Sequence, residues 1–298
     1  MSITSLNQIL DLAIKQKTKK LAIAASAEIH VLQAVKEAVK KQIIEPVFIG
    51  DEPLTRKIAA SIDFNIEGFV IIDEKDVSLA VIKAVKLVKE GKADFLMKGM
   101  VSTAPLLKAV LNKEEGLRKR DTLSHFALIE TSYYHKLLGI TDAGMNINPG
   151  IKEKVSIIEN AAEVFHSLGE KQPKVAVIGP VEVVNPKIQS TTDAVELLEM
   201  YKRNQIKSCI VDGPLAIDNA VSNEAANLKG IKSEVAGDAD ILLAPDINSG
   251  NILYKTMIFL SNASSAAIIL GAQVPIVLTS RADSKQNKLY SIALAAII

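Results

Sequence analysis

The chain has 298 residues, of which 48% are apolar and 23% charged, and this allows one large or two medium domains around a sizeable core. Its 35 basic and 34 acidic residues give a net charge of +1, which argues against nucleic acid or an anionic membrane as the main partner. Aromatic residues make up only 4%, so the core must consist mainly of aliphatic side chains, as in strands buried on both faces.

Cysteine usage and apolar runs indicate the compartment. Cys209 is the single cysteine, which rules out an internal disulfide and fits a reducing cytosol. We interpret it as a buried, unreactive thiol because it lies in an apolar run. The first twenty residues contain no signal-peptide core, and the longest apolar stretch, 266–278, is interrupted by glycine, glutamine and proline. We therefore expect a cytoplasmic protein that does not bind membranes.

Short apolar runs, each typical of a buried strand, recur along the chain. They lie at 21–25, 47–49, 69–72, 95–97, 126–129, 137–141, 175–178, 209–211, 241–244 and 276–278. Segments with helical periodicity separate most of them, for example 29–41, 77–89 and 155–168. This alternation predicts an α/β fold with mostly parallel strands and right-handed crossovers.

Two crossover segments predict a discontinuous domain arrangement. The stretch 142–150 is rich in glycine, asparagine and proline and suits a hinge, and a second crossover is expected near Asn262. Domain I would then comprise 1–142 and 262–298, and domain II would be the insert 143–261. A cleft between two such domains is a preferred place for a ligand.

The most informative junction follows the strand expected at 276–278. Thr279, Ser280, Arg281 and Asp283 lie between it and a segment with helical periodicity. Open α/β sheets bind ligands at such junctions, where free backbone N–H groups favour an anion. Ser280 can donate a hydroxyl hydrogen bond, and Arg281 can form two parallel hydrogen bonds to phosphate. These two residues are our candidates for catalysis.

A second junction follows the strand expected at 95–97. Lys98, Ser102 and Thr103 can contact an anion there, but Ser102 or Thr103 can equally cap the next helix. Near the strand expected at 126–129, Ser124 is a further substrate-binding candidate, although its hydroxyl can merely satisfy backbone groups. His125 can transfer protons near neutral pH or be structural.

Acidic and amide side chains mark the remaining junctions. Asp142 caps a turn or holds a ligand, and Asp212 ends a strand as a site candidate. Asp246, Asn248 and Lys255 gather within one short segment after the strand at 241–244, where a plain loop is the alternative to ligand contact.

Several stronger signatures are absent from the sequence. No Gly-x-Gly-x-x-Gly or Gly-Lys-Ser/Thr loop is present, and no Gly-x-Ser-x-Gly elbow marks a hydrolase serine. The acidic residues and the four histidines show no metal-ligand spacing, so we expect no metal site.

From about residue 94 to the C-terminus, the chain resembles the phosphate acetyl/butyryltransferase family. The likeness rests on KGMVST at 98–103, LSH at 123–125, VEVVNP at 181–186, IVDGPLAIDNAVS at 210–222, DILLAPDINSGN at 240–251 and TSRADS at 279–284. Before residue 94 it is looser.

The resemblance implies a fold like that of the isocitrate and isopropylmalate dehydrogenases, in a homodimer or higher homo-oligomer. It implies reversible reaction of a short acyl-CoA, butyryl-CoA by preference, with inorganic phosphate to give acyl phosphate and free CoA. Coenzyme A is then a substrate, and no tightly bound cofactor is expected. Ser280 and Arg281 match the family's Ser-Arg pair. The acetyl-specific relatives carry an aspartate six residues after that arginine, where this chain has Asn287, which cannot take a proton.

Three alternatives remain at this point. Phosphate acetyltransferase activity differs only in the acyl pocket, which the sequence does not show. An NAD(P)-dependent decarboxylating dehydrogenase would need a metal-binding aspartate constellation. A non-catalytic protein that binds CoA or phosphate would bind without releasing a thiol.

Overall fold

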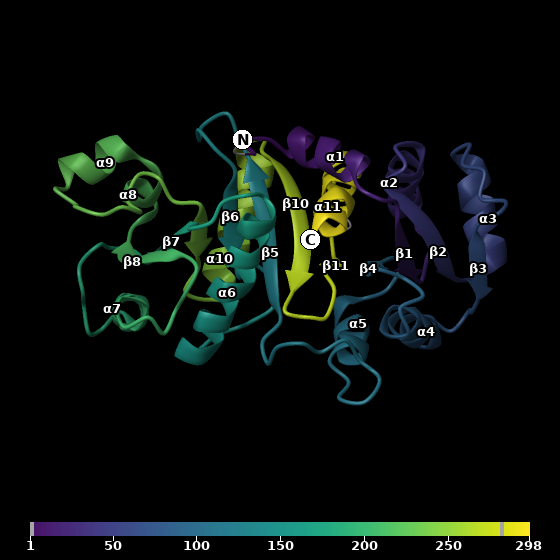
Figure 1. Ribbon diagram of the computed structural model, residues 1–298, viewed down its shortest axis with the longest axis horizontal. Helices are drawn as coiled ribbons and strands as arrows, with labels where there is room; N and C mark the ends of the chain where they lie inside the picture. The colour runs from purple at the N-terminus through teal and green to yellow at the C-terminus, as the bar shows by residue number, and fades with distance from the viewer. Residues whose placement is uncertain (1–2, 281–282) are drawn as a thin grey trace. The chain divides into compact units, whose positions relative to one another are not determined.

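The computed structural model describes residues 3–280 and 283–298, which form two compact units (Figure 1). Unit 1 consists of Met1–Leu6 and Thr122–Ser265, and unit 2 of Asn7–Asp121 and Ala266–Ile298. The first change of unit lies before the domain exit predicted near 142, and the second lies close to the return predicted near 262. That the units work as two domains stays a prediction.

Unit 2 contains a six-stranded, mostly parallel arrangement in the order β3-β2-β1-β4-β11-β10. Neighbouring strands are parallel except for β10 and β11, which are antiparallel. The strands are β1 (Lys19–Ala24), β2 (Ile44–Gly50), β3 (Val70–Asp73), β4 (Phe95–Lys98), β10 (Ser264–Leu270) and β11 (Ile276–Val277). The helices are α1 (Leu6–Lys15), α2 (Ile29–Lys40), α3 (Glu52–Ser61), α4 (Val77–Lys89), α5 (Thr103–Val110) and α11 (Lys285–Ile297).

Unit 1 contains five strands in the order β5-β6-β9-β7-β8. Here β5 and β6 are antiparallel, and the other neighbours are parallel. The strands are β5 (Ser124–Glu130), β6 (Leu138–Thr141), β7 (Lys174–Ile178), β8 (Ile210–Leu215) and β9 (Ile241–Leu243). The helices are α6 (Ile151–Ser167), α7 (Gln189–Lys202), α8 (Ile217–Val221), α9 (Asn223–Leu228) and α10 (Ile247–Leu260). The predicted α/β class with mostly parallel pairing is confirmed.

Local sequence signals explain where several helices begin and which face they bury. Asp51 and Asp76 cap α3 and α4 by accepting hydrogen bonds from backbone N–H groups of the first turn. In α4, Ala80, Val81 and Val85 lie at helical spacing and are buried. Within the described residues, no helix is both long and apolar enough to cross a bilayer.

Strand β10 (Ser264–Leu270) was not among the predicted strands. Its sequence, SSAAIIL, contains two alanines, which have the highest helix propensity, and no turn residue interrupts it. Pairing with β11 and nearly complete burial decide in favour of a strand.

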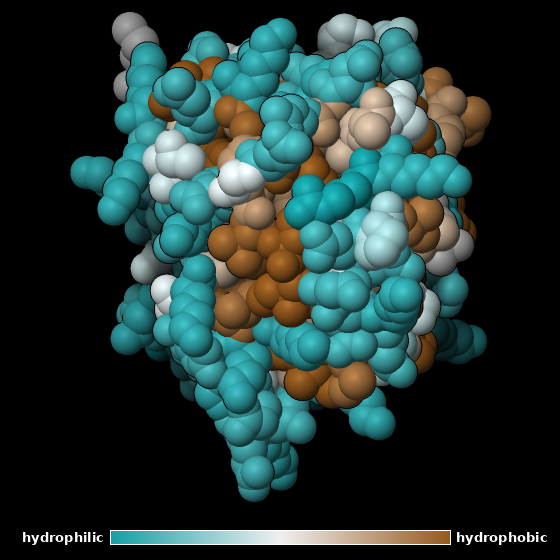
Figure 2. Space-filling view, turned by 90° about the vertical axis from the view of Figure 1, so that its right-hand side faces the viewer, coloured by the Kyte–Doolittle hydropathy of each residue, from teal (hydrophilic) through white to brown (hydrophobic). Residues whose placement is uncertain are grey.

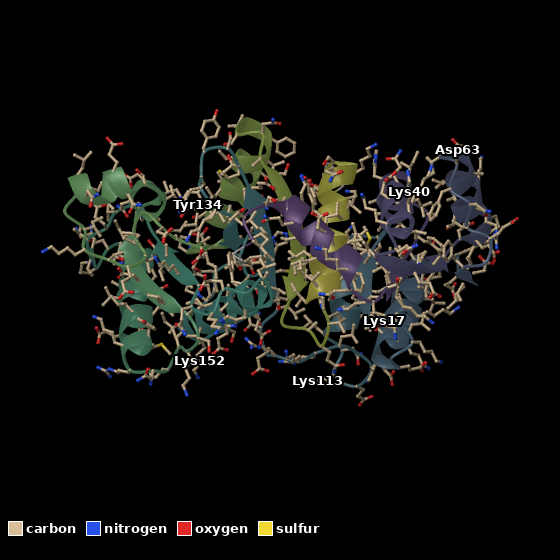
Figure 3. The ribbon with its side chains drawn as sticks, turned by 45° about the horizontal axis from the view of Figure 1, so that its top comes forward. Lys17, Lys40, Asp63, Lys113, Tyr134 and Lys152 are labelled. Carbon is tan, nitrogen blue, oxygen red and sulfur yellow. The ribbon has the colours of Figure 1, made fainter. Side chains whose placement is uncertain are left out.

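Unit 1 is braced by charged side chains beside β9. Tyr134, labelled in Figure 3, donates its hydroxyl to the carbonyl of Ala239 at 2.7 Å. Lys174 and Lys136 bind Asp238 at 2.6 and 2.9 Å. Burial alone would raise the pKa of Asp238, but hydrogen bonds from Lys174, Lys136 and His135 hold it below its ordinary value.

Strand β3 is the edge strand of unit 2 and leaves apolar surface exposed. Figure 2 looks onto this side of the molecule and shows a hydrophobic area among hydrophilic side chains. Large apolar residues that stay exposed on β3 and α4 are Val70, Val77, Leu79 and Ile82. The edge is only four residues long, which limits the number of unpaired backbone groups that another strand can reach.

At Gly99 the turn after β4 packs closely against the end of β1. Its N–H donates to the Ala24 carbonyl at 2.8 Å, and an added Cβ would lie 2.1 Å from the Ala25 oxygen. We expect Gly99→Ala to lower the free energy of unfolding by about 1–3 kcal/mol, because backbone must shift. Urea unfolding measures this. Gly144→Ala is the matched control, since its nearest atom would be 3.5 Å away. Equal stability of both variants would contradict the close packing of Gly99 against Ala25.

Candidate active site

The carboxyl ends of three neighbouring strands lie side by side at one end of the sheet in unit 2. Strands β1, β4 and β11 are parallel neighbours, with Ala24 opposite Lys98 and Val277 opposite Met97. Their carboxyl ends therefore face the same way, and the segments that follow them lie along a common edge. This geometry brings Lys98 and the Thr279–Ser280 segment, predicted separately, to the same edge.

The segment after β11 is held by hydrogen bonds on both sides of Ser280. The Ser280 N–H donates to Asp283 Oδ2 at 2.6 Å, and its carbonyl accepts from Lys288 Nζ at 2.6 Å. Ser284 caps α11, since Ser284 Oγ accepts from the Asn287 N–H at 3.1 Å. Asp283 therefore stabilises the loop that precedes α11. Arg281 lies outside the described residues.

At the end of β4, Lys98 is buried and donates to the Val101 carbonyl at 3.0 Å, so it closes its own turn. Ser102 is the N-cap residue of α5, but its exposed side chain makes no capping hydrogen bond. Thr103 begins the helix and is half-buried. Contact of these three side chains with substrate stays a prediction.

In unit 1, Ser124 and His125 lie in the interior. Ser124 Oγ accepts from Asn160 Nδ2 at 3.0 Å, and the His125 ring contacts Tyr254 edge-on, with 5.8 Å between ring centroids. Asp142 organises a turn: it accepts from the N–H groups of Gly144 and Met145 at 2.8 and 2.9 Å and from Asn146 at two atoms. Asp142 was interpreted as a turn cap or ligand group, and the turn role is confirmed.

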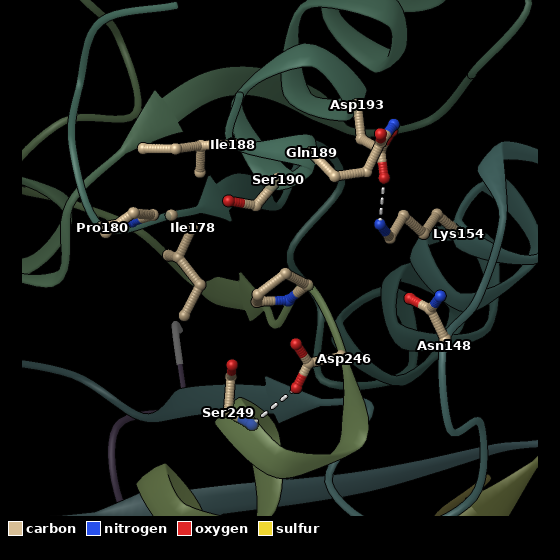
Figure 4. A pocket seen from close by; sticks show the side chains of 12 residues that line it. Asn148, Lys154, Ile178, Pro180, Ile188, Gln189, Ser190, Asp193, Asp246 and Ser249 are labelled. Carbon is tan, nitrogen blue, oxygen red and sulfur yellow. Dashed lines mark hydrogen bonds and ion pairs between the residues drawn. The ribbon is translucent and has the colours of Figure 1, made fainter. Parts of the chain in front are cut away.

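A cavity of about 530 Å³ opens at the carboxyl ends of β7 and β9 in unit 1 (Figure 4). One wall comes from the start of α7 and another from the start of α10. The lining residues are Asn148, Lys154, Ile178, Gly179, Pro180, Ile188, Gln189, Ser190, Asp193, Pro245, Asp246 and Ser249. Its volume lies within the usual range for small-molecule sites.

Only one of the three substrate-binding candidates predicted after β9 lines this cavity. Asp246 lines it and caps α10, accepting from the Ser249 N–H at 2.8 Å. Asn248 and Lys255 are exposed on α10 and are not among the lining residues. Within residues 3–280 and 283–298, no three His, Cys, Asp or Glu side chains form a group that could hold a metal.

A buried ion pair that the sequence did not reveal borders the cavity. Lys154 Nζ lies 2.5 Å from Asp193 Oδ2, with side chains 4% and 11% exposed, and Gln189 also donates to Asp193 at 2.6 Å (Figure 4). The two residues are far apart in sequence and each looks like an ordinary helix-surface charge, so no local signal could pair them.

We expect Lys154→Met to lower the free energy of unfolding by about 3–5 kcal/mol, because Asp193 would remain buried without its partner. The double variant Lys154→Met, Asp193→Leu should recover most of this loss. Urea unfolding of the single and double variants checks both statements. A double variant less stable than the single one would show that the pair itself stabilises the unit.

Comparison with known proteins shows which family the chain resembles. A family model described as phosphate acetyl/butaryl transferase matches residues 74–296. The phosphate butyryltransferase of Clostridium acetobutylicum is 47% identical over 99% of this chain and 98% of its own. The phosphate acetyltransferase of Thermotoga maritima is 46% identical over 98% of this chain and 99% of its own.

A solved structure agrees with these sequences. The branched-chain phosphotransacylase from Enterococcus faecalis V583 matches with a TM-score of 0.82 at 34% identity, covering 94% of this chain and 98% of its own. The family match spans most of the chain, including both the segment after β11 and the cavity of unit 1. The chain therefore belongs to the phosphate acetyl/butyryl transferase family.

Proposed function

We propose that this protein transfers a short acyl group, butyryl by preference, reversibly between the thiol of coenzyme A and inorganic phosphate. The observation that carries the proposal is the near full-length similarity to transferases of this family. The sequence Ser280–Arg281, which resembles the family's Ser-Arg pair, agrees with it. The identities to a butyryl and an acetyl enzyme are nearly equal, so the acyl preference depends on pocket size and is the finer part of the proposal.

The chemistry needs placement more than a strong base. A phosphate oxygen attacks the thioester carbonyl carbon, a C–O bond forms, the C–S bond breaks, and the thiolate leaves and takes a proton from solvent. Both the nucleophile and the carbonyl oxygen carry negative charge in the transition state. Arg281 would bind phosphate through two hydrogen bonds, and Ser280 with nearby N–H groups would stabilise the developing oxyanion. Alignment alone can supply about 7–11 kcal/mol.

We assign part of coenzyme A to the cavity of unit 1. The pantetheine portion is narrow and carries two amides, which need neutral hydrogen-bonding groups beside apolar walls. Asn148, Gln189 and Ser249 offer such groups, and Ile178 and Ile188 offer apolar surface. Lys98, Ser102, Thr103, Ser124, Asn248 and Lys255 remain proposed substrate contacts.

The remaining expectations belong to the same proposal: a dehydrogenase-like two-domain fold, a cytoplasmic location, no tightly bound cofactor and a homo-oligomer. Exposed apolar side chains on α10, Ile252, Phe259 and Leu260, support the homo-oligomer, since a second copy would cover them. Light scattering at several concentrations measures the mass.

The proposed reaction is tested by an acyl-CoA panel assayed for thiol release. We expect release to depend on phosphate, and kcat/KM to be about tenfold or more higher for butyryl-CoA than for acetyl-CoA, because each methylene adds about 1–3 kcal/mol in an apolar pocket. Equal release without phosphate would indicate a hydrolase. Binding of CoA with no release from any acyl-CoA would indicate a non-catalytic binder. Faster turnover of acetyl-CoA would reassign the acyl preference.

Arg281→Lys should lower kcat/KM for phosphate by about 10²-fold, because a single ammonium cannot replace the two parallel hydrogen bonds of the guanidinium. Initial rates at limiting phosphate measure this. Arg56→Lys is the control, since Arg56 pairs with Glu52 at the exposed surface of α3. Wild-type rates at limiting phosphate in Arg281→Lys would remove Arg281 from the site.

A further inference from the structure

Lys288 is a buried lysine that the reaction scheme above leaves without a role. It lies in the first turn of α11 and is only 2% exposed, among the most buried large side chains of the chain. Placing an ammonium group in the interior is costly unless hydrogen bonds or opposite charges compensate it. The contacts of its Nζ atom show where the compensation comes from.

The ammonium of Lys288 contacts the segment that follows β11. Nζ donates to the Ser280 carbonyl at 2.6 Å and lies 3.4 Å from Thr279 Oγ1. The Ser280 carbonyl belongs to the peptide bond that joins Ser280 to Arg281. Lys288 therefore holds the main chain between the two residues proposed to act on phosphate.

Asp283 holds the same residue from the other side. Its Oδ2 accepts from the Ser280 N–H at 2.6 Å, and Asp283 is itself buried. Burial lowers the pKa of Lys288, while the charges of Asp283 and Glu28 act to raise it. Both polar groups of the Ser280 main chain are thus fixed by buried, ionisable side chains.

We infer that Lys288 is a positioning residue for phosphate transfer, whose ammonium fixes the Ser280 peptide group and so orients Ser280. This inference rests on the proposed function. It adds a residue that acts through Ser280 and does not itself touch the reacting atoms.

The variant Lys288→Met keeps an unbranched stem in the interior but removes all three donors. We expect kcat/KM for phosphate to fall by about 10²-fold, the scale of a small misplacement of reacting groups. The KM for butyryl-CoA should stay unchanged, because Ser280 is proposed to act on the oxyanion that develops in the transition state and not on the bound thioester. Lys285→Met is the matched control: Lys285 begins the same helix but is exposed, and this variant should keep wild-type rates.

Chemical rescue separates positioning from stability. In Lys288→Ala, ethylammonium chloride should restore part of the phosphate-dependent rate by supplying the missing donor. Tetramethylammonium chloride carries the same charge without N–H groups and should restore nothing. Far-UV circular dichroism and the urea midpoint report on folding in each variant.

The outcomes divide cleanly. Wild type without phosphate-dependent thiol release would overturn the proposed function itself. An active wild type with Lys288→Met as fast as Lys285→Met would overturn only the role of Lys288. Loss of folded structure in both Lys288 variants, or a loss of rate in Lys288→Ala that ethylammonium restores no better than tetramethylammonium, would make Lys288 a stabilising residue and also overturn it.

Discussion

The parallel pairing of β1, β4 and β11 is the constraint on which the arrangement at the edge of unit 2 depends. Strand β11 is only two residues long, yet it pairs with β4 on one side and β10 on the other. This pairing sets the register that places Lys98 next to the start of the Thr279–Asp283 segment. A slip of one residue would turn each side chain of β11 to the opposite face. Burial of Ile276 and Val277 holds the register against such a slip.

Much of the fold could be predicted because apolar runs and turn residues alternate regularly. The predicted helix at 77–89 coincides with α4, and the strand expected at 95–97 is β4 less its last residue. Strand β10 was missed because its alanines are equally compatible with a helix, and only tertiary pairing decides between the two. The first change of compact unit, near 121, lies ahead of β5 and β6, whose pairing is invisible in the sequence. The domain boundaries expected near 142 and 262 stay a prediction.

The candidate site could be predicted only where a polar group directly follows a strand. Such positions gave Ser280, Lys98 and Asp246, because strand ends are recognisable locally. Lys288 and the pair Lys154–Asp193 were missed, since a lysine within a helix is normally solvated. One signal was present: Lys288 precedes Ile292 by four residues, on the apolar stripe of α11. Which carboxylate faces a buried lysine depends on long-range packing, and no local pattern encodes it.

The burial of Cys209 has a chemical consequence for a protein that handles activated acyl groups. Thioesters exchange readily with free thiolates, and a protein that bears an accessible one acylates itself in the presence of its own substrate. Cys209 is 1% exposed, and burial raises its pKa to about 12. The only sulfhydryl in the chain is therefore both shielded and protonated at neutral pH, so the polypeptide offers no sulfur that could divert the acyl group from its inorganic acceptor.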